Sequence, residues 1–438
     1  MSDHGVPYTI LDYPVRFLLS GPAAGVSAGV YLGEAIGSKD IITYDMGGTS
    51  TDVSLTRNLK PVITRERLFA GVPIKTPQLD IITIGTGGGS IAWVDENASL
   101  KVGPQSAGAE PGPASYAKGG SRATVTDASL LLGYLSVDTP LAGGLRLNKE
   151  LAEEAVTSLG QQAKISDQYR LAAGIIEISI GNMAGAIRTL SIERGLDPRE
   201  FTLVSIGGAG PMYAIPIAEE LGAETVLVSN HPGNACAFGL LTTDLQHHYT
   251  RTYVIELQEA DLPLLRVLLQ EMEEEGRDAL TKEGLTGERV HIAYSADMRY
   301  VGQSYQLEVP VDLKTDLEAM HRDFHDIYHQ TYGYSRKQMT IEIVYLRVVA
   351  SGRFDKPVLR SDGMARGSLS EARTEERSVY FRDKFMTCPV YDRGLLPPES
   401  SLDGPAIIEE YGSTTVVFPE WKASVDRYAN LILERAEG

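Results

Sequence analysis

The amino-acid sequence predicts an α/β lobe followed by a β-rich α+β domain. Three observations predict it. Short apolar runs alternate with helical patterns as far as about residue 250, and glycine turns follow two of those runs. Beyond residue 250 the pattern changes to paired strands. With 438 residues, of which 43% are hydrophobic, the chain is long enough for two or three packed domains.

The first region, residues 1–250, alternates strands and helices. Each expected strand is a short apolar run, and each expected helix repeats apolar residues every three or four positions. The expected strands are 40–46, 53–58, 201–207 and 225–229. The expected helices are 21–37, 148–163, 166–195 and 212–222.

A glycine-rich insertion interrupts this region at about residues 78–125. Its segments "GTGGGS" and "GPQSAGAEPGPASYAKGG" are too rich in loop-forming residues for a packed layer. We expect a structured insertion near a site, and plain surface loops are the alternative.

The second region, residues 251–438, has a different texture. We expect a charged helix at 262–283, then strands in "HIAYSADMRYVGQSYQLEVPV" and "IEIVYLRVVASGRF". A stretch rich in proline and charge at 356–377 suggests a linker, and the tail consists of short strands.

Charge and cysteine content exclude several classes of protein. A net charge of −18 argues against broad binding to nucleic acid or anionic membranes, because such binding needs clustered Lys and Arg. No signal peptide or apolar membrane span is evident. Cys236 and Cys388 are too few for a disulfide scaffold or a thiolate cluster, so we expect two buried cysteines in a soluble cytoplasmic protein.

The motif "DMGGTSTD" follows the first predicted strand. Gly47 and Gly48 would let backbone N–H groups approach a phosphate closely. Asp45 would repel a bare phosphate, so it fits only if Mg²⁺ or its bound water lies between, or if it orients a nucleophile. Asp52 is a second such group or a turn residue, and a simple β-hairpin turn is the alternative for the whole motif. Hydroxyl donors would come from Thr49, Ser50 and Thr51.

A second glycine turn, "GGAGP", follows the strand at 201–207 and precedes a helix. A strand, a glycine turn and a helix N-terminus favour a phosphate, or an adenosine lying over bare backbone. Taken alone, this motif is more often a tight connection. Two such turns in one α/β region are what a bound nucleotide would need. The residues of this turn are Gly207, Gly208, Ala209 and Gly210.

Many blocks in order resemble the hydantoinase A/5-oxoprolinase family, which includes nucleotide-handling subunits of acetone and acetophenone carboxylases. They include "SGPAAGV", "ITYDMGGTSTDVSL", "TIGTGGGSIAWVD", "GNMAGAIRTLSIERGLDPREF", "GGAGP", "HPGNACAFGLLTTD", "MRYVGQSYQL" and "GPAIIEEYGSTTVV". The resemblance implies an actin-like (ribonuclease H-like) ATPase fold in which two lobes close over MgATP. It assigns "DMGGTST" to the second phosphate-binding turn and "GGAGP" to the adenosine turn. We predict Asp45 and Asp52 as the catalytic residues.

The activity implied by this resemblance is ATP-dependent hydrolysis of a cyclic amide, such as a lactam, a hydantoin or 5-oxoproline, with a hydantoinase B-like partner. Two other hypotheses are the ATP-using subunit of an acetone- or acetophenone-type carboxylase and a non-catalytic nucleotide-sensing or scaffold subunit. The family also carries a first phosphate turn similar to "DIGGTFTD", of which this sequence has no copy. We expect a separate subunit to supply that lobe; a truncated chain is the alternative.

Two positions in the insertion depart from the family pattern. Ile82 stands in "LDIIT", where members often have His, and Ser115 stands in "PGPASY", where they often have Cys. Neither residue suits a soft metal, so we expect no tight zinc site. Asp80 and Asp127 remain as substrate candidates, together with His231, for which a capped turn is an equal alternative.

His321, His325 and His329 are spaced by four residues, which permits metal ligation on one helix face. No acidic partner accompanies them in a familiar motif. We therefore favour an exposed helix face over a metal site.

Overall fold

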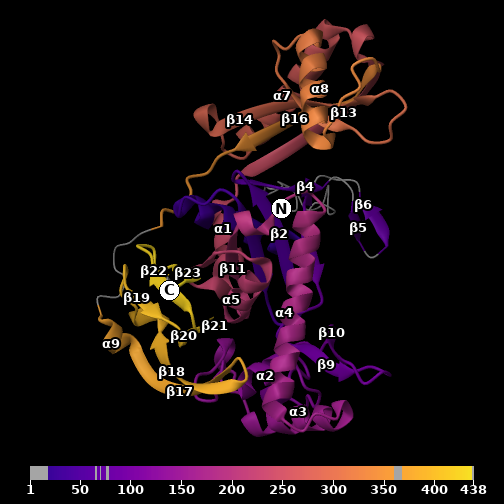
Figure 1. Cartoon of the computed structure of the whole chain (residues 1–438). Coiled ribbons are helices and arrows are strands. Elements are labelled where there is room, and N and C mark those ends of the chain that lie inside the picture. The colour runs from indigo at the N-terminus through magenta and orange to yellow at the C-terminus, as the bar shows by residue number, and fades with distance from the viewer. Residues whose placement is uncertain (1–17, 65–66, 70, 75–77, 360–366, 437–438) are drawn as a thin grey trace. The chain divides into compact units, whose positions relative to one another are not determined.

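The computed structural model describes residues 18–64, 67–69, 71–74, 78–359 and 367–436 (Figure 1). The chain divides into two compact units. The larger, called the sheet unit below, comprises residues 19–242 and 357–438. The other, called the small unit, contains residues 243–356.

A mixed nine-stranded sheet forms the centre of the sheet unit (Figure 1). The strand order is β19-β22-β23-β12-β11-β1-β2-β3, and β8 also pairs with β2. Strand β11 is parallel to both β1 and β12, whereas β1–β2 and β12–β23 are antiparallel. The bounds are β1 Ile41–Met46, β2 Thr51–Arg57, β3 Lys60–Pro61, β8 Ile81–Ile84, β11 Thr202–Ile206, β12 Thr225–Val228, β19 Ser401–Asp403, β22 Trp421–Val425 and β23 Leu431–Arg435.

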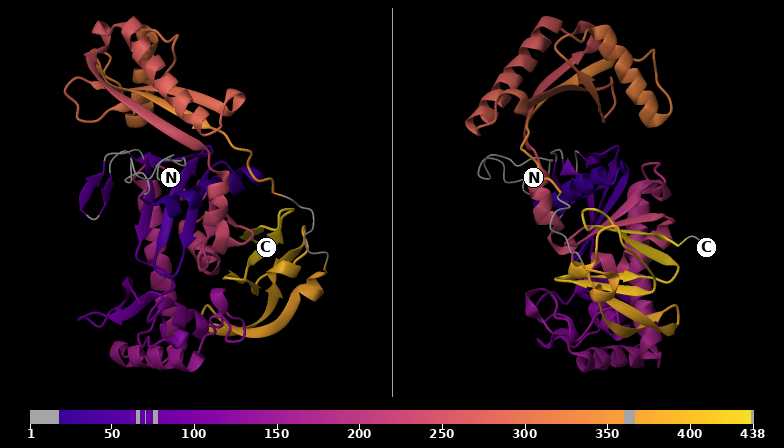
Figure 2. Two further views of the ribbon diagram at one scale, coloured as in Figure 1. Left: turned by 180° about the vertical axis from the view of Figure 1, so that it is seen from behind. Right: turned by 90° about the vertical axis from the view of Figure 1, so that its left-hand side faces the viewer.

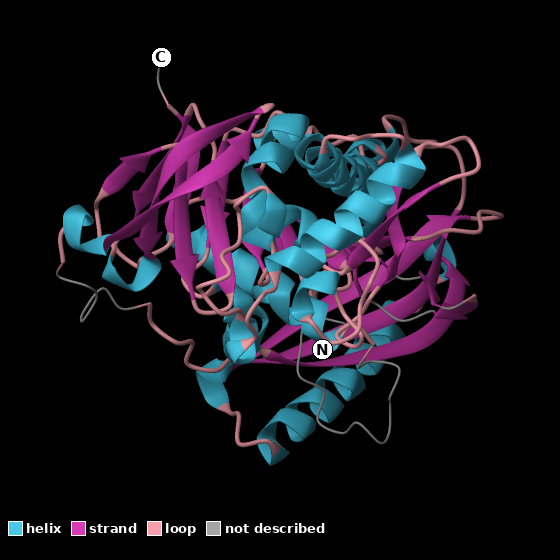
Figure 3. Cartoon of the chain, turned by 90° about the horizontal axis from the view of Figure 1, so that it is seen from below, coloured by secondary structure: helices cyan, strands magenta, loops and turns pink. Residues whose placement is uncertain are grey.

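Helices cover both faces of this sheet because its central strands are apolar on both sides. Ile42, Tyr44 and Met46 belong to the main core together with α4 and α5, whereas Ile41 lies in a separate cluster with α1. Figures 2 and 3 show these helices against the strands from other directions. The helices of this unit are α1 Ser20–Ala35, α2 Val125–Leu131, α3 Lys149–Ala163, α4 Gln168–Ile192, α5 Gly210–Leu221, α6 Ala235–Thr242 and α9 Leu369–Ala372.

A row of glycines brings α1 close to β1. Gly25, Gly29 and Gly33 are four residues apart and therefore share one helix face. A Cβ atom at Gly29 would lie 2.2 Å from Oγ1 of Thr43, and one at Gly33 would lie 2.1 Å from Cδ1 of Ile41. Any larger residue would push the helix away from the strand.

The C-terminal residues complete the sheet unit. Residues 251–438, which we predict as one C-terminal domain, contribute to both compact units, and β23 pairs with β12 and thereby extends the central sheet. A second sheet, in the order β17-β18-β20-β21, belongs to the same unit. Its strands are β17 Arg373–Phe381, β18 Lys384–Asp392, β20 Ala406–Glu410 and β21 Ser413–Val417. The sequence pattern predicts strands here, but local periodicity does not specify which distant strand each one joins.

The small unit is a four-stranded antiparallel sheet, in the order β13-β16-β14-β15, with two helices. The expected pair of strands appears as β14 and β15, and the expected charged helix as α7. The bounds are β13 Leu245–Glu256, α7 Leu262–Lys282, β14 Val290–Tyr300, β15 Leu307–Val311, α8 Leu317–Tyr332 and β16 Ile341–Gly352.

The remaining strands lie in or before the glycine-rich insertion. At the start of the insertion β7 pairs with β4, the next strand β8 pairs with β2 in the central sheet, and β9 and β10 form a hairpin. The bounds are β4 Ile63–Thr64, β5 Arg67–Phe69, β6 Val72–Ile74, β7 Gln78–Leu79, β9 Ser90–Val94 and β10 Leu100–Ser106. The expected linker at 356–377 contains α9 and the start of β17, and its residues 360–366 lie outside the described part.

Within the described residues, α4 is the one helix long and apolar enough to cross a membrane, by length and composition alone. Half of its apolar window is buried inside the structure. A core helix of a soluble protein passes the same test, so α4 is weak evidence for a membrane segment.

We predict that Gly239→Ala destabilises the sheet unit by about 1–3 kcal/mol. A Cβ atom at Gly239 in α6 would lie 1.8 Å from the backbone oxygen of Ala24 in α1, so the two helices must separate. Denaturant unfolding measures the effect. Gly181→Ala in α4 is the matched control, because a Cβ there meets no atom within 4 Å and the helix gains up to about 1 kcal/mol. Equal stability of the two variants would contradict the close packing of α1 on α6.

Candidate functional site

The two glycine turns meet at one edge of the central sheet. Asp45 is the penultimate residue of β1, where it pairs with Ile206 of β11 on one side and with Asp52 of β2 on the other. Because β1 and β11 are parallel, both end at the same edge, and the turn that follows each strand lies there. The expected strand 53–58 begins at Thr51 instead, which puts Asp52 directly opposite Asp45.

The second glycine turn rests directly on the first strand. Gly207 has a positive φ of 82°. A Cβ atom there would lie 2.4 Å from Oδ1 of Asp45 and 2.4 Å from the carbonyl oxygen of Met46, so only glycine fits. The backbone N–H of Ala209 donates to the same Met46 carbonyl at 3.0 Å. The residues from 207 to 210 therefore lie against the end of β1.

The first glycine turn is open on its outer side. A Cβ atom at Gly47 or Gly48 would meet no atom within 4 Å, and Gly48 and Thr49 are exposed. This is the space that a close approach of phosphate to backbone N–H groups requires.

Thr51 is a correction to the predicted set of hydroxyl donors. Its side chain is fully buried, and its Oγ1 donates to the carbonyl oxygen of Thr86 at 2.6 Å. The hydroxyl therefore holds the turn to the insertion, and Thr49 and Ser50 are the hydroxyls left for a ligand.

The insertion supports the first turn from behind. The N–H groups of Gly88 and Gly89 donate to the carbonyls of Gly47 and Gly48, at 3.1 and 2.6 Å. A Cβ atom at Gly87 would lie 2.7 Å from the backbone nitrogen of Ser50. The "GTGGGS" segment thus fixes the backbone of the turn, which agrees with our expectation that the insertion lies near the site.

The two carboxylates carry charge that the protein neutralises only in part. Burial raises the pKa of Asp45, and a hydrogen bond from the thiol of Cys236 at 2.9 Å partly offsets that rise. Burial also raises the pKa of Asp52; the hydroxyl of Thr83 opposes this effect, and the neighbouring Asp45 adds to it. Two adjacent carboxylates whose pKa values rise for these reasons favour a nearby cation.

Mg²⁺ fits this pair better than a metal held wholly by protein would. Within the described residues, no group of three or more His, Cys, Asp or Glu side chains is placed to hold a metal ion. Mg²⁺ commonly uses one or two carboxylates together with waters and substrate phosphates. Asp45 and Asp52 beside an open glycine turn match that donor set. The expectation that the chain has no tight zinc site stays a prediction.

Asp127, predicted as a substrate candidate, is better explained as a structural residue. It is fully buried and caps helix α2, accepting hydrogen bonds from the backbone N–H groups of Ala114, Ser115 and Thr124 and from the Thr124 hydroxyl. These four hydrogen bonds occupy most of the acceptor positions of the carboxylate, so little capacity is left to bind a substrate.

Asp80 is likewise committed to the protein. It is 7% exposed, forms an ion pair with Arg194, and its Oδ1 lies 3.7 Å from Arg67. Two guanidinium groups offset the carboxylate, so the predicted substrate role is not supported by its contacts.

His231, the third substrate candidate, lies beside the second glycine turn. Its side chain is 70% exposed, and the carbonyl of the next residue, Pro232, accepts the N–H of Gly207 at 2.9 Å. Nδ1 of His231 is 3.5 Å from the buried carboxylate of Glu410, which in turn pairs with Arg393 at 3.4 Å. His231 thus lies beside the second glycine turn, and its role toward a substrate stays a prediction.

The turn at 410–412 is a part of the site that sequence reasoning missed. A Cβ atom at Gly208 would lie 2.9 Å from the carbonyl oxygen of Gly412. The C-terminal strands thus bring a turn against the predicted adenosine turn. Cys236 was also missed, because we took it for a plain buried cysteine. The turn at 410–412 lies within the motif "GPAIIEEYGSTTVV", but no local sequence pattern indicates that this turn lies beside "GGAGP".

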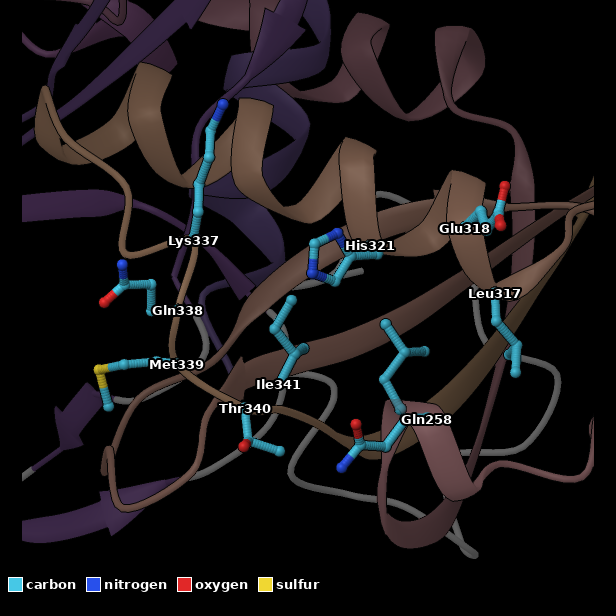
Figure 4. A pocket seen from close by; sticks show the side chains of 10 residues that line it. Gln258, Leu317, Glu318, His321, Lys337, Gln338, Met339, Thr340 and Ile341 are labelled. Carbon is cyan, nitrogen blue, oxygen red and sulfur yellow. The ribbon is translucent and has the colours of Figure 1, made fainter.

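A pocket of about 430 Å³ lies in the small unit (Figure 4). His321 and Lys337 line it, together with apolar side chains that include Ile341. No residue of the predicted site set lines this pocket.

The predicted exposed face of the histidine helix is only partly confirmed. His321 is exposed, but His325 is buried, and its Nδ1 lies 2.8 Å from the hydroxyl of Tyr300. The expectation of an exposed face is therefore wrong for His325.

Comparisons with known proteins agree with the resemblance seen in the motifs. The profile of the hydantoinase/oxoprolinase family matches residues 8–249, and that of the hydantoinase/oxoprolinase C-terminal domain matches residues 258–436. The chain belongs to the hydantoinase/oxoprolinase family.

Individual members of the family show the same relationship. The caprolactamase subunit alpha of Pseudomonas jessenii is 34% identical over 422 residues, covering 94% of this chain and 60% of the relative. The 5-oxoprolinase 1 of Arabidopsis thaliana is 31% identical over 445 residues, covering 96% and 34%. This chain therefore spans well under two thirds of the length of both relatives.

Two solved structures share the fold. The crystal structure of the ATP-dependent caprolactamase from Pseudomonas jessenii matches with a TM-score of 0.82 at 34% identity, covering 95% of this chain and 62% of that one. A nucleotide-free acetone carboxylase structure matches with a TM-score of 0.82 at 25% identity, covering 96% and 62%. The mixed α/β fold with a β-rich C-terminal region is thereby confirmed.

We predict that Asp127→Asn lowers the free energy of unfolding by about 2–3 kcal/mol, because an amide N–H₂ would face donors that now share a carboxylate. Chemical denaturation measures the loss. Glu96→Gln, an exposed change of the same kind, is the control and should stay within about 0.5 kcal/mol of the wild type. An unchanged stability for Asp127→Asn would make this carboxylate a substrate candidate again.

Proposed function

We propose that this chain is the nucleotide-handling part of an ATP-dependent amidohydrolase that opens cyclic amides such as lactams, hydantoins or 5-oxoproline. The observation that carries the proposal is the meeting of two glycine turns at Asp45, with the outer side of the first turn open. Family relatives named caprolactamase and 5-oxoprolinase supply the class of substrate.

ATP and Mg²⁺ are the cofactors that this site suits. The turn from Gly47 to Ser50 would hold the phosphates, the turn from Gly207 to Gly210 would hold the adenosine, and Asp45 would hold Mg²⁺ through bound water, with Asp52 beside it. When bound, MgATP supplies the phosphoryl group that turns an amide oxygen into part of a good leaving group.

The chain's own residues act in this reaction by position and charge. The N–H of Gly47 donates to the carbonyl of Ser50 within the turn, so the other backbone N–H groups of the first turn would donate to phosphate oxygens. The hydroxyls of Thr49 and Ser50 would add two donors. Asp45 keeps its carboxylate at the point where the turns meet, which fixes the direction of its oxygens. In phosphoryl transfer the protein forms few covalent bonds itself and acts mainly by positioning groups and stabilising charge.

The proposed partners follow from the family. A hydantoinase B-like subunit would complete the hydrolysis. Relatives named as subunits, among them caprolactamase subunit alpha and acetone carboxylase beta subunit, support an assembly of several chains. We place this assembly in the cytoplasm, in keeping with the two unpaired cysteines among the described residues.

A carboxylase role is the second candidate, favoured by the match to acetone carboxylase over 96% of this chain. The same site would then serve phosphorylation of a ketone enol and bicarbonate. Substrate screening separates the two candidates: lactam-stimulated ATP hydrolysis supports the amidohydrolase, and bicarbonate-dependent turnover with a ketone supports the carboxylase.

We predict that Asp45→Asn lowers ATP turnover of the reconstituted complex by at least about 100-fold, because the cation and phosphates lose an oriented carboxylate. Phosphate release in the presence of each substrate class measures turnover. Asp403→Asn, on the exposed edge strand β19, is the control and should leave turnover unchanged.

An unchanged rate for Asp45→Asn would sink the catalytic proposal. A wild-type complex that assembles but hydrolyses no ATP with any lactam, hydantoin, 5-oxoproline or ketone would instead support the scaffold hypothesis. Assembly is followed by size-exclusion chromatography with light scattering, so the two failures remain distinct.

A further inference from the structure

We propose that Cys236 is a positioning residue for Asp45, and that its thiol fixes the direction in which the carboxylate meets a bound nucleotide and its cation. This inference rests on the proposed function. It assigns a role in the site to a residue that the sequence offered only as a buried cysteine.

The first observation is the contact itself. Sγ of Cys236, the second residue of α6, lies 2.9 Å from Oδ2 of Asp45. A carboxylate can only accept a hydrogen bond, so the thiol is the donor. This is the one side-chain hydrogen bond that the described structure gives to Asp45.

The second observation concerns the other carboxylate oxygen. Oδ1 of Asp45 lies only 2.4 Å from the place that a Cβ atom of Gly207 would occupy. One oxygen is therefore bound to the thiol, while the other faces the glycine turn at which we place the nucleotide. Rotation of the carboxylate would break the first contact and redirect the second oxygen.

The third observation is the packing of α1 around the pair. A Cβ atom at Gly25 would lie 3.0 Å from Sγ of Cys236 and 3.6 Å from Oδ2 of Asp45. Gly25 thus leaves just enough room for the thiol and the carboxylate. Gly239, one turn along α6 from Cys236, brings that helix against Ala24 of α1. The two helices thus pack closely beside the thiol, which suits a supporting residue for a functional carboxylate.

We expect the loss of the thiol donor to weaken the binding of Mg²⁺ and nucleotide more than it lowers the stability of the fold. In Cys236→Ala the carboxylate loses its anchor and samples other rotamers, so fewer molecules present the required direction. We expect the Mg²⁺ concentration for half-maximal ATP turnover to rise about 3- to 10-fold, corresponding to the loss of about one ordinary hydrogen bond, because a thiol is a weak donor. Cys236→Ser keeps a donor at the same position and should restore most of the wild-type value.

The test uses the reconstituted complex with three variants: Cys236→Ala, Cys236→Ser and the control Cys388→Ala. Cys388 is fully buried in β18, so its truncation also removes a buried sulfur atom but touches no site residue. Two quantities are measured: the Mg²⁺ dependence of ATP turnover, and the rise in Tm of the complex on adding MgATP. Because either Ala variant can lower the starting Tm, the rise is compared rather than the Tm itself.

The inference is supported if Cys236→Ala needs more Mg²⁺ and shows a smaller MgATP-induced rise in Tm, while Cys236→Ser and Cys388→Ala resemble the wild type. It is overturned if Cys236→Ala keeps the wild-type values, or if Cys236→Ser is as impaired as Cys236→Ala. A wild-type complex with neither turnover nor a rise in Tm overturns the proposed function, and this inference with it.

Discussion

The parallel pairing of β1 with β11 is the constraint on which the rest of the site depends. It brings the ends of two strands, about 160 residues apart in the sequence, to one edge of the sheet. The N–H of Ala209 then reaches the carbonyl of Met46, and Gly207 comes to lie on Asp45. Helices α1 and α6, the glycine-rich insertion and the turn at 410–412 all pack around this meeting point.

Glycine makes the meeting possible at three backbone contacts. Gly207 lies against the carbonyl of Met46, Gly87 lies against the backbone of the first turn, and Gly208 lies against the carbonyl of Gly412. A side chain at any of these positions would separate the segments. The site is therefore built mainly from backbone, which suits the handling of phosphate, because N–H groups at fixed positions offset its charge without reorganising.

The contacts of each carboxylate distinguish structural acids from functional ones. Asp127 accepts hydrogen bonds from four donors, and two guanidinium groups flank Asp80. Among the described residues, the thiol of Cys236 makes the one side-chain hydrogen bond to Asp45, which also lies beside Asp52, so its charge is poorly compensated. A partly buried carboxylate that receives little compensation from the protein is the one most suited to a cation or a substrate.

The sequence by itself determined the α/β class, the principal strands and helices and the two glycine turns, because periodicity and turn chemistry are properties of neighbouring residues. It also carried the family motifs. Only the tertiary structure decided that the C-terminal strands join the central sheet, that Thr51 faces Thr86 and that Asp127 accepts hydrogen bonds from Ala114 and Ser115. The contact between Cys236 and Asp45 spans 191 residues of sequence. A local pattern cannot specify such a contact, because it depends on how whole strands and helices pack.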